Sequence, residues 1–257
     1  LLLNDYARIL CVSTWKKVAA TMLAPAMIYR LRKIRKEYDI IHIHHPDPMA
    51  CLALFLSGYK GPVVLHWHSD ILKQKMLLKL YDPLQKWLLR RAEVIVGTTP
   101  VYVRESPFLE EIQYKVTSIP IGVDKMKPIP ERVEQVKEKY AGKKIIFSLG
   151  RLVEYKGYEY LIRAARQLTD DYVILIGGKG PLWENLQALI NELGVADKVK
   201  LLGFIDDQHL PDYFGACDLF CLSSIWKTEA FGIVQIEAMS CGKPVIAMNI
   251  PESGVNW

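Results

Sequence analysis

The 257-residue sequence has few cysteines and no long apolar run, and each shortage excludes a class of protein. The five cysteines are scattered, and no two have the spacing of a zinc finger or a redox motif. This excludes a disulfide framework and favours a reducing compartment. The longest apolar run, Met49 to Ser57, is too short to span a bilayer, and no segment has the pattern of a signal peptide. We therefore expect a cytoplasmic protein, soluble or peripheral to the inner face of the membrane.

Basic residues are unevenly distributed along the chain. Residues 1–125 carry 18 Lys and Arg against 11 Asp and Glu, whereas residues 126–257 carry 15 against 17. Two segments are especially basic, and they contain Arg30, Arg32, Lys33, Arg35 and Lys36, and Lys73, Lys75, Lys79 and Lys86. The excess predicts an anionic partner, for which we expect a membrane surface and not nucleic acid. A solvated basic face explains it equally well.

Short apolar, β-branched runs alternate with helical patterns along most of the chain. Such nearly continuous runs are typical of parallel strands covered on both faces. The expected strands are 39–44, 62–67, 93–97, 116–119, 144–149, 172–176, 198–202, 218–222 and 244–248. The expected helices are 24–38, 49–58, 71–91, 131–140, 158–168, 182–193, 208–216 and 232–240. Strand followed by helix, repeated, predicts an α/β fold of doubly wound parallel sheets.

The alternation is interrupted once, at the segment KPIP from Lys127 and the charged helix after it. Proline and charge with few apolar residues are typical of a linker. We therefore predict an N-terminal Rossmann-like domain over 1–125, a linker over 126–142 and a C-terminal Rossmann-like domain over 143–257. Two such domains are expected to face each other across a cleft, with ligands beyond the carboxyl ends of the strands.

The strongest chemical signal is the segment EAFGIVQIE, from Glu229 to Glu237. Gly232 is expected at the start of a helix, where it lets a ligand approach the backbone and where free N–H groups favour a phosphate. Glu229 offers its carboxylate oxygens to sugar hydroxyls, and Glu237 offers them to a ribose. An ordinary amphipathic helix with a capping acid is the alternative.

Two cations follow the expected strand 144–149, in the segment GRLVEYKG. Arg151 and Lys156 on one strand-to-helix loop can hold a diphosphate, the first with a planar fork and the second with a point charge. Cations there stabilise the negative charge that builds on a leaving diphosphate. Loop cations that are merely solvated are the alternative.

Glycines follow the next two expected strands. The segment IGGKGP, which contains Gly178, looks like a phosphate loop but matches neither the dinucleotide fingerprint nor the Walker motif. A tight turn therefore explains it as well. Gly203 and Phe204 end the following strand and can present backbone groups or a ring to a base.

Two histidine motifs, HIHH from His42 and HWHSD from His66, end strands of the first domain. Gathered histidines can indicate a metal, but alternation sends neighbouring side chains to opposite sides of a strand. No cysteine or carboxylate cluster with ligand spacing joins them. We therefore expect no metal site and interpret these residues as a polar cleft wall, with His68 best placed to meet a ligand.

Together and in this order, these segments resemble the retaining glycosyltransferases of family 4, which have the GT-B fold. The resemblance covers nearly the whole chain and includes the GRL and KG loop, IGGKGP, LLGFIDD, ACDLFCLSS, the helix with its two glutamates, and CGKPVIA. The segments HIHHPDP and HWHSD resemble the bacterial polysaccharide-assembly members of that family.

The resemblance implies roles for matching residues. His68 would contact the transferred sugar, Arg151 and Lys156 would hold the donor diphosphate, and Glu229 and Glu237 would bind the sugar and the ribose. The other donor-binding residues would be Gly178, Gly203, Phe204, Phe231, Gly232 and Ile233. The resemblance also implies a hexosyl transfer from a UDP- or GDP-linked sugar to a glycan or lipid-linked acceptor. Anomeric configuration would be retained, and neither metal nor cofactor would be needed.

The sequence departs from the family pattern at both ends. The family's first strand with its glycine-rich loop, and its last strands with the closing helix, have no counterpart here, so we expect a truncated chain with both domains incomplete. Two other interpretations therefore stay open: a GT-B sugar-nucleotide epimerase, and a non-catalytic fragment or scaffold.

Overall fold

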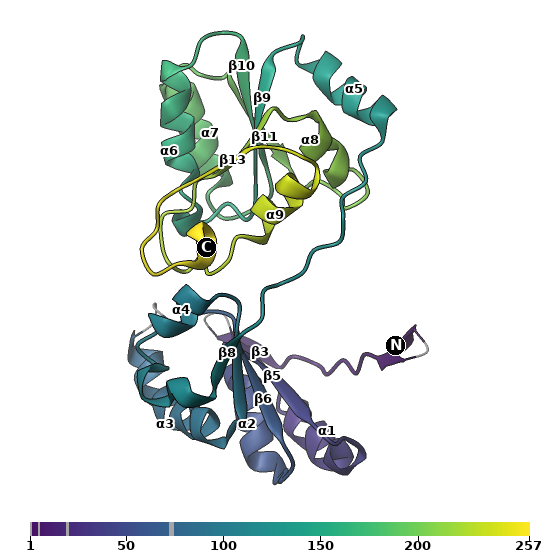
Figure 1. The fold of residues 1–257 in the computed structure, drawn as a ribbon, viewed down its shortest axis with the longest axis vertical. Coiled ribbons are helices and arrows are strands. Elements are labelled where there is room, and N and C mark those ends of the chain that lie inside the picture. Colours follow the sequence, from purple (N-terminus) through teal and green to yellow (C-terminus); the bar gives the residue numbers. More distant parts are fainter. Residues whose placement is uncertain (1, 5, 19–20, 72–74) are drawn as a thin grey trace. The chain divides into compact units, whose positions relative to one another are not determined.

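The computed structural model describes residues 2–4, 6–18, 21–71 and 75–257 (Figure 1). The chain forms two units, Leu1–Ile119 and Pro120–Trp257. The units therefore divide between Ile119 and Pro120, earlier in the chain than the boundary at residue 125 that the sequence suggested. Each unit is an α/β body around a parallel sheet, as the sequence predicted.

The first unit is built on a four-stranded parallel sheet in the order β5-β6-β7-β8. Its strands are β5 Ile41–His45, β6 Val63–Trp67, β7 Val94–Gly97 and β8 Val116–Ser118. Its helices are α1 Ala26–Ile34, α2 Pro48–Ser57, α3 Lys75–Arg91 and α4 Pro100–Arg104, with 3-10 turns at Arg35–Glu37 and Glu110–Lys115. Two small hairpins that the sequence did not suggest precede them: β1 Leu2–Asn4 with β2 Ala7–Arg8, and β3 Lys16–Val18 with β4 Thr21–Leu23.

A capping side chain fixes where α2 begins. The Asp47 carboxylate accepts the backbone N–H groups of Met49 and Ala50 at 2.9 and 3.0 Å, so α2 starts three residues after β5 ends. Gly58, with φ of 69°, ends that helix.

No helix in the described part of the chain is long and apolar enough to cross a membrane.

The second unit is built on a five-stranded parallel sheet in the order β11-β10-β9-β12-β13. Its strands are β9 Lys144–Leu149, β10 Tyr172–Gly177, β11 Val199–Gly203, β12 Leu219–Leu222 and β13 Val245–Ala247. Its helices are α5 Pro130–Lys139, α6 Tyr158–Ala164, α7 Trp183–Glu192, α8 Leu210–Ala216 and α9 Ile233–Ser240, with 3-10 turns at Glu154–Lys156, Ala165–Gln167 and Gly254–Asn256. The chain winds outward from β9 and then returns to its other side, so the strand order reverses between β9 and β12. That reversal creates the crevice in which such sheets bind ligands.

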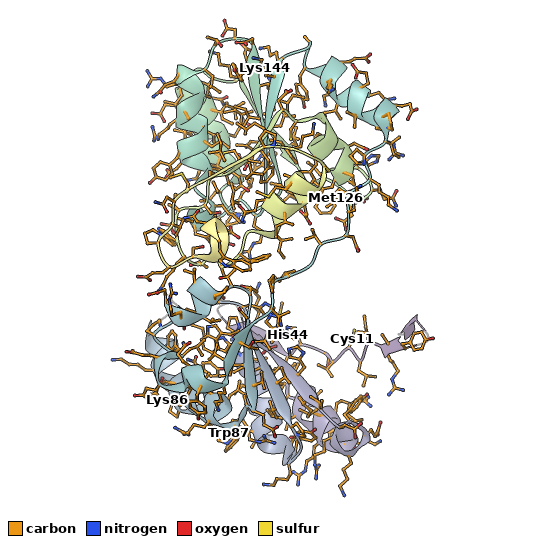
Figure 2. All side chains as sticks on the ribbon, in the orientation of Figure 1. Cys11, His44, Lys86, Trp87, Met126 and Lys144 are labelled. Carbon is orange, nitrogen blue, oxygen red and sulfur yellow. The ribbon has the colours of Figure 1, made fainter. Side chains whose placement is uncertain are left out.

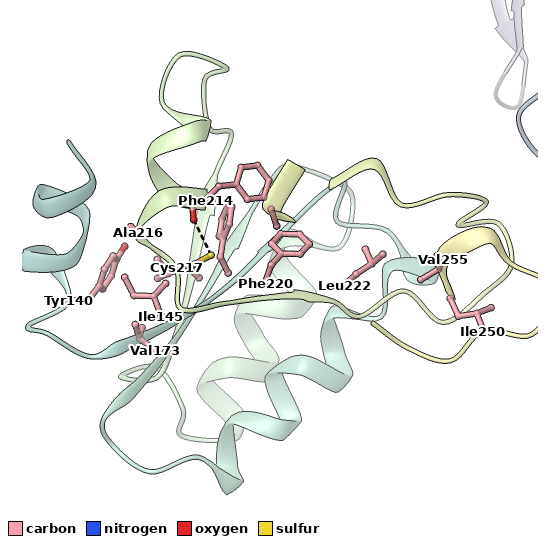
Figure 3. Close-up of a cluster of buried hydrophobic side chains, with 13 residues drawn as sticks. Tyr140, Ile145, Val173, Phe214, Ala216, Cys217, Phe220, Leu222, Ile250 and Val255 are labelled. Atoms are coloured by element: carbon pink, nitrogen blue, oxygen red, sulfur yellow. Dashed lines mark hydrogen bonds between the residues drawn. The ribbon is translucent and has the colours of Figure 1, made fainter. Parts of the chain in front are cut away.

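Alternate residues of the central strands enter two apolar cores, one on each face of the second sheet. Ile145 and Phe147 pack on one face with Phe214 and Phe220 (Figure 3). Ile146 lies between them in sequence and enters the opposite core, under α6 and α7. Burial on both faces is the reason that these strands read as continuous apolar runs.

The segment predicted as a linker packs on the second unit. The carboxylate of Asp212 in α8, 2% exposed, accepts the backbone N–H of Ile129 at 2.8 Å. Gly215 lies so close that a Cβ there would come within 2.7 Å of Pro128 and 2.8 Å of Val133. Residues 128–139 are therefore part of the second unit's structure, with α5 laid along α8 (Figure 1).

Candidate functional site

Backbone hydrogen bonds join three loops at the carboxyl ends of β9, β10 and β11. The N–H of Gly150 donates to Gly177 at 3.0 Å, and the N–H of Gly178 donates to Gly203 at 2.7 Å. Gly178 has a φ of 129°, and a Cβ there would lie 1.9 Å from the carbonyl oxygen of Gly150. Only glycine fits this position, so the segment IGGKGP is a close backbone junction of the site.

A second junction fastens the loop after β9 to the loop after β12, on the two sides of the switch point. The Ser223 hydroxyl donates to the carbonyl of Lys156 at 2.8 Å, and the Ile225 N–H donates to the carbonyl of Tyr155 at 2.8 Å. Gly157, with φ of 63°, permits this approach, because a Cβ there would lie 2.2 Å from the carbonyl oxygen of Ser223. The two loops therefore hold their side chains in a fixed relation.

Lys156 and Glu229 meet at this junction as a buried ion pair. Lys156 Nζ lies 2.5 Å from Glu229 Oε2, and only 10% and 12% of the two side chains are exposed. Ser224, 1% exposed, donates its hydroxyl to the same carboxylate oxygen at 2.7 Å. A Cβ on Gly150 would lie 3.4 Å from Lys156 Nζ, so the ammonium rests against bare backbone. The sequence predicted both charged residues, and the structure brings them into contact.

Two tyrosines beside this pair have raised pKa values. Burial, and then the Glu229 charge, raise the pKa of Tyr158 well above its usual range. The same two causes raise the pKa of Tyr155, and the charge of the exposed Arg151 opposes them. Both phenols therefore stay neutral at pH 7. The site offers them as hydroxyls beside one carboxylate and two cations.

The loop from Glu229 to Gly232 is held in place by the end of the chain. The Ser253 hydroxyl donates to the carbonyl of Glu229, and the Gly254 N–H donates to Ala230 at 3.1 Å. Gly232 has a φ of 74° and is the N-cap of α9, with no side-chain cap. The first N–H groups of α9 therefore stand next to Glu229 without a side-chain partner at the cap, which is where an anion is stabilised.

Three other predicted residues lie in α9 or directly before its N-cap. Phe231 is buried, and its carbonyl accepts a hydrogen bond from Gln235 at 3.1 Å. Ile233 and Glu237 line a hollow of about 470 Å³ together with Pro211 and residues 121–127. Burial, and then the charge of Asp207, raise the pKa of Glu237.

Phe204 presents an exposed ring at the edge of the second unit's site. The ring is 65% exposed, and Lys179 Nζ lies 5.7 Å from its centroid. Phe204 directly follows Gly203, whose carbonyl takes part in the glycine junction. A fixed backbone therefore carries a cation and an aromatic face side by side.

His68 belongs to the first unit, in a loop anchored by hydrogen bonds. Its N–H donates to the carbonyl of His45 at 3.1 Å. Two residues on, the Asp70 carboxylate accepts the Trp67 indole N–H at 2.9 Å and the Ser106 hydroxyl at 2.7 Å. The His68 ring meets His44, with 2.7 Å between His68 Nε2 and His44 Nδ1. Alternation does send His45 to the other side, but the register of the strands gathers His42, His44, His66 and His68, which the sequence did not predict.

Three serines of the second unit's site were missed in the sequence. Ser223, Ser224 and Ser253 hold the backbone of Lys156, the carboxylate of Glu229 and the carbonyl of Glu229. The first two stand directly after the apolar strand β12, in the segment ACDLFCLSS. Their place at the carboxyl end of a parallel strand was the available signal.

Two family models match consecutive parts of the chain. Residues 3–126 match the model described as Glycosyltransferase Family 4, and residues 131–254 match Glycosyl transferases group 1. The D-rhamnosyltransferase WbpZ of Pseudomonas aeruginosa is 33% identical over 91% of this chain and 61% of its own length. The O-antigen chain mannosyltransferase C of Escherichia coli is 30% identical over 91% of this chain and 62% of its own length. The chain thus spans about three fifths of the length of these curated relatives.

A solved structure matches most of the chain. Anabaena Alr3699/HepE, in complex with UDP and glucose, matches with a TM-score of 0.76 and 25% identity, over 91% of this chain and 64% of the other. The same protein has also been solved with UDP-glucose, and that structure matches with a TM-score of 0.74. The chain thus matches a Glycosyltransferase Family 4 model followed by a Glycosyl transferases group 1 model, and its fold is that of the GT-B glycosyltransferases.

Proposed function

We propose that this protein transfers a hexose from a UDP- or GDP-linked sugar to a glycan or lipid-linked acceptor in bacterial cell-envelope polysaccharide synthesis. The observation that carries the proposal is the buried Lys156–Glu229 pair at the switch point of the second sheet. The UDP and UDP-glucose complexes of HepE support a nucleotide-sugar donor. The names of the rhamnosyl- and mannosyltransferase relatives support the class of reaction.

In this proposal the donor lies along the glycine junction. Lys156 and Arg151 bind the diphosphate together with the first N–H groups of α9. Glu229 accepts hydrogen bonds from sugar hydroxyls, and Glu237 accepts them from the ribose in the hollow of about 470 Å³. Gly178, Gly203 and Phe204 stand on the side of the base, and His68 contacts the transferred sugar.

The chemistry follows from the charges of the site. The bond between the anomeric carbon and the phosphate oxygen breaks, and Arg151 and Lys156 stabilise the negative charge that develops on the leaving diphosphate. The departing phosphate accepts the proton of the acceptor hydroxyl, whose oxygen then bonds to the anomeric carbon on the same face. Configuration is retained without an enzymic nucleophile, and the two cationic side chains take the part that a metal ion plays elsewhere.

Calorimetric titration of the chain with UDP, GDP and ADP tests the donor site. We expect one of the three to bind, and Lys156→Met to weaken it by about tenfold or more, because a charge-assisted contact is lost. Lys200→Met, at an exposed position of the same unit, is the matched control and should bind like wild type. Glu229→Gln should weaken the binding of the nucleotide sugar more than the binding of the nucleoside diphosphate. If none of the three nucleotides binds, the proposal fails.

We also propose that the first unit lies against an anionic membrane surface at the cytoplasmic face. The exposed side of α1 carries Arg30 and Lys33 next to Tyr29, which is 67% exposed. The second basic segment supports the idea less. Lys73 and the Lys75 side chain lie outside the described residues, and Lys86 is paired with Asp82 at 2.8 Å.

Vesicle sedimentation tests this membrane contact. We expect binding to anionic vesicles, and a loss of about tenfold or more in Arg30→Glu/Lys33→Glu, because each basic residue near such a surface is worth about 1 kcal/mol. The matched control is Lys137→Glu/Lys139→Glu on α5 of the second unit. Equal recovery with neutral and anionic vesicles would count against the contact.

A further inference from the structure

Four histidines form one face of the sheet of the first unit. His42 and His44 alternate along β5, and His66 and His68 alternate along the end of β6, with His44 in register with His66. Side chains two residues apart point to the same face, and register partners of parallel strands lie side by side. The rings of His44 and His66 are 5.3 Å apart, and those of His66 and His68 are 4.1 Å apart. His44 stands at the carboxyl end of β5 and is exposed (Figure 2).

Ring nitrogens from three of these histidines converge on one point. One nitrogen each from His44, His66 and His68 lies within 4.8 Å of the other two. The rings of His44 and His68 are inclined by only 9°, with centroids 5.0 Å apart and nitrogens 2.7 Å apart. The two rings therefore lie edge to edge and share a single proton between two acceptor-capable nitrogens.

His66 shows that the cluster is incompletely satisfied. Its Nε2 is shielded from solvent and has no hydrogen-bond partner among the residues that the structure describes. A buried polar atom without a partner is costly. An ion bound between the rings would supply the missing interaction.

We propose that His44, His66 and His68 bind a divalent transition-metal ion, with Zn²⁺ as the ion that best fits three neutral imidazoles. Imidazole suits zinc, copper and nickel, and three histidines with an open fourth position are an established zinc arrangement. His42, stacked at 4.7 Å on His44, or a water is available for the fourth position.

The nearly parallel rings must rotate before their nitrogens can accept the ion. Zinc–nitrogen bonds of about 2.0–2.1 Å place two ligands of a tetrahedral site about 3.3 Å apart. The nitrogens of His44 and His68, 2.7 Å apart, must move slightly apart, and the more widely spaced nitrogens must approach each other. The imidazoles are carried by β5, β6 and the anchored loop after β6. The ion replaces the proton shared by His44 and His68.

The three histidines belong to the first unit, whereas Lys156 and Glu229 of the proposed donor site belong to the second. The metal site shares His68 with the proposed function, and His68 cannot bind metal and contact a sugar at the same time. Zinc is therefore expected to inhibit transfer.

Direct metal binding tests the proposal without any activity measurement. The chelator-treated chain carries Cys11→Ser, which removes an exposed thiol that could bind metal by itself. Zn²⁺ is titrated by calorimetry, and Co²⁺ by visible absorption, because Co²⁺ reports nitrogen coordination in its spectrum. We expect one ion per chain with micromolar affinity, and a thermal stabilisation that grows with ion concentration.

Histidine variants locate the ion. His44→Gln, at an exposed position, should weaken binding by about tenfold or more through the loss of one ligand, and His66→Gln should do the same. His209→Gln is the matched control, because His209 is the histidine outside both motifs. Circular dichroism of the metal-free variants checks that each is folded. Millimolar or weaker binding, or binding unchanged in His44→Gln, overturns the proposal.

Discussion

Replacing Lys156 with methionine should destabilise the second unit by about 3 kcal/mol. Removing one member of a buried ion pair costs about 3–5 kcal/mol, because the other charge stays buried without its partner. The lower end applies here, since Ser224 still donates to Glu229 Oε2 at 2.7 Å and methionine fills the space of the lysine stem.

A double variant separates the pair from its surroundings. In Lys156→Met/Glu229→Gln no charge is buried, and glutamine keeps an acceptor oxygen for Ser224. We expect this variant to lie within about 1 kcal/mol of wild type, so that the coupling energy of the pair is about 2 kcal/mol or more. Amide hydrogen exchange of β9 peptides in increasing urea measures it, because exchange there reports the opening of the second unit alone.

A matched pair on the surface gives the reference. Lys227 Nζ and Glu252 Oε2 are 2.8 Å apart, but 22% and 49% of their side chains are exposed. The same cycle with Lys227→Met and Glu252→Gln should give a coupling below about 1 kcal/mol. A buried pair that couples no more strongly than this exposed pair would contradict the predicted effect of burial.

Three further predictions compare variants at Gly157, Glu237 and Asp70. Gly157→Ala should lower the free energy of unfolding by about 3 kcal/mol or more, and Gly194→Ala by about 1 kcal/mol, as measured by hydrogen exchange of β9 peptides. Both glycines have a φ of 63°, but only at Gly157 would a Cβ collide with the Ser223 carbonyl. Because burial raises the pKa of Glu237, wild type loses stability as pH rises above the ordinary carboxyl range. Glu237→Gln should therefore melt higher than wild type at pH 7 and equally at pH 4; a lower melting temperature at pH 7 would contradict this. Asp70→Ala should lower the stability of the first unit by about 2–4 kcal/mol, because it leaves the buried indole and hydroxyl donors unpaired. Asp70→Asn should lower it less. Equal hydrogen exchange of β6 peptides in the two variants would contradict this.

Much of the fold was predictable because the central strands are buried on both faces. The apolar run at 144–149 became β9 with the same bounds, and 172–176 became β10 with one more residue. The hairpins in the first 23 residues were not predictable, since their strands are two or three residues long and carry no apolar period. The helix α4 was also missed. Its N-cap Thr99 signals a start, but only five residues follow as helix.

The site was predictable as residues but not as contacts. Lys156 and Glu229 are 73 positions apart, and they meet only because β9 and β12 are neighbours. Motif spacing cannot give that strand order. The contacts between the histidines likewise depend on how two strands pair. Alternation separates His44 from His45 within one strand, but the register between β5 and β6 decides that His44 lies beside His66.

The glycine junction of the second unit also bears on how donor preference can change. Its geometry comes from backbone atoms, and a side chain at Gly178 would collide with the carbonyl of Gly150. Two positions next to these glycines, Lys179 and Phe204, are exposed. In the proposed donor site, selectivity for a base or a sugar is therefore expected to change at Lys179 and Phe204 while the loops keep their shape. A library that randomises these two positions and retains Arg151 and the glycines would sample new donors on a constant scaffold.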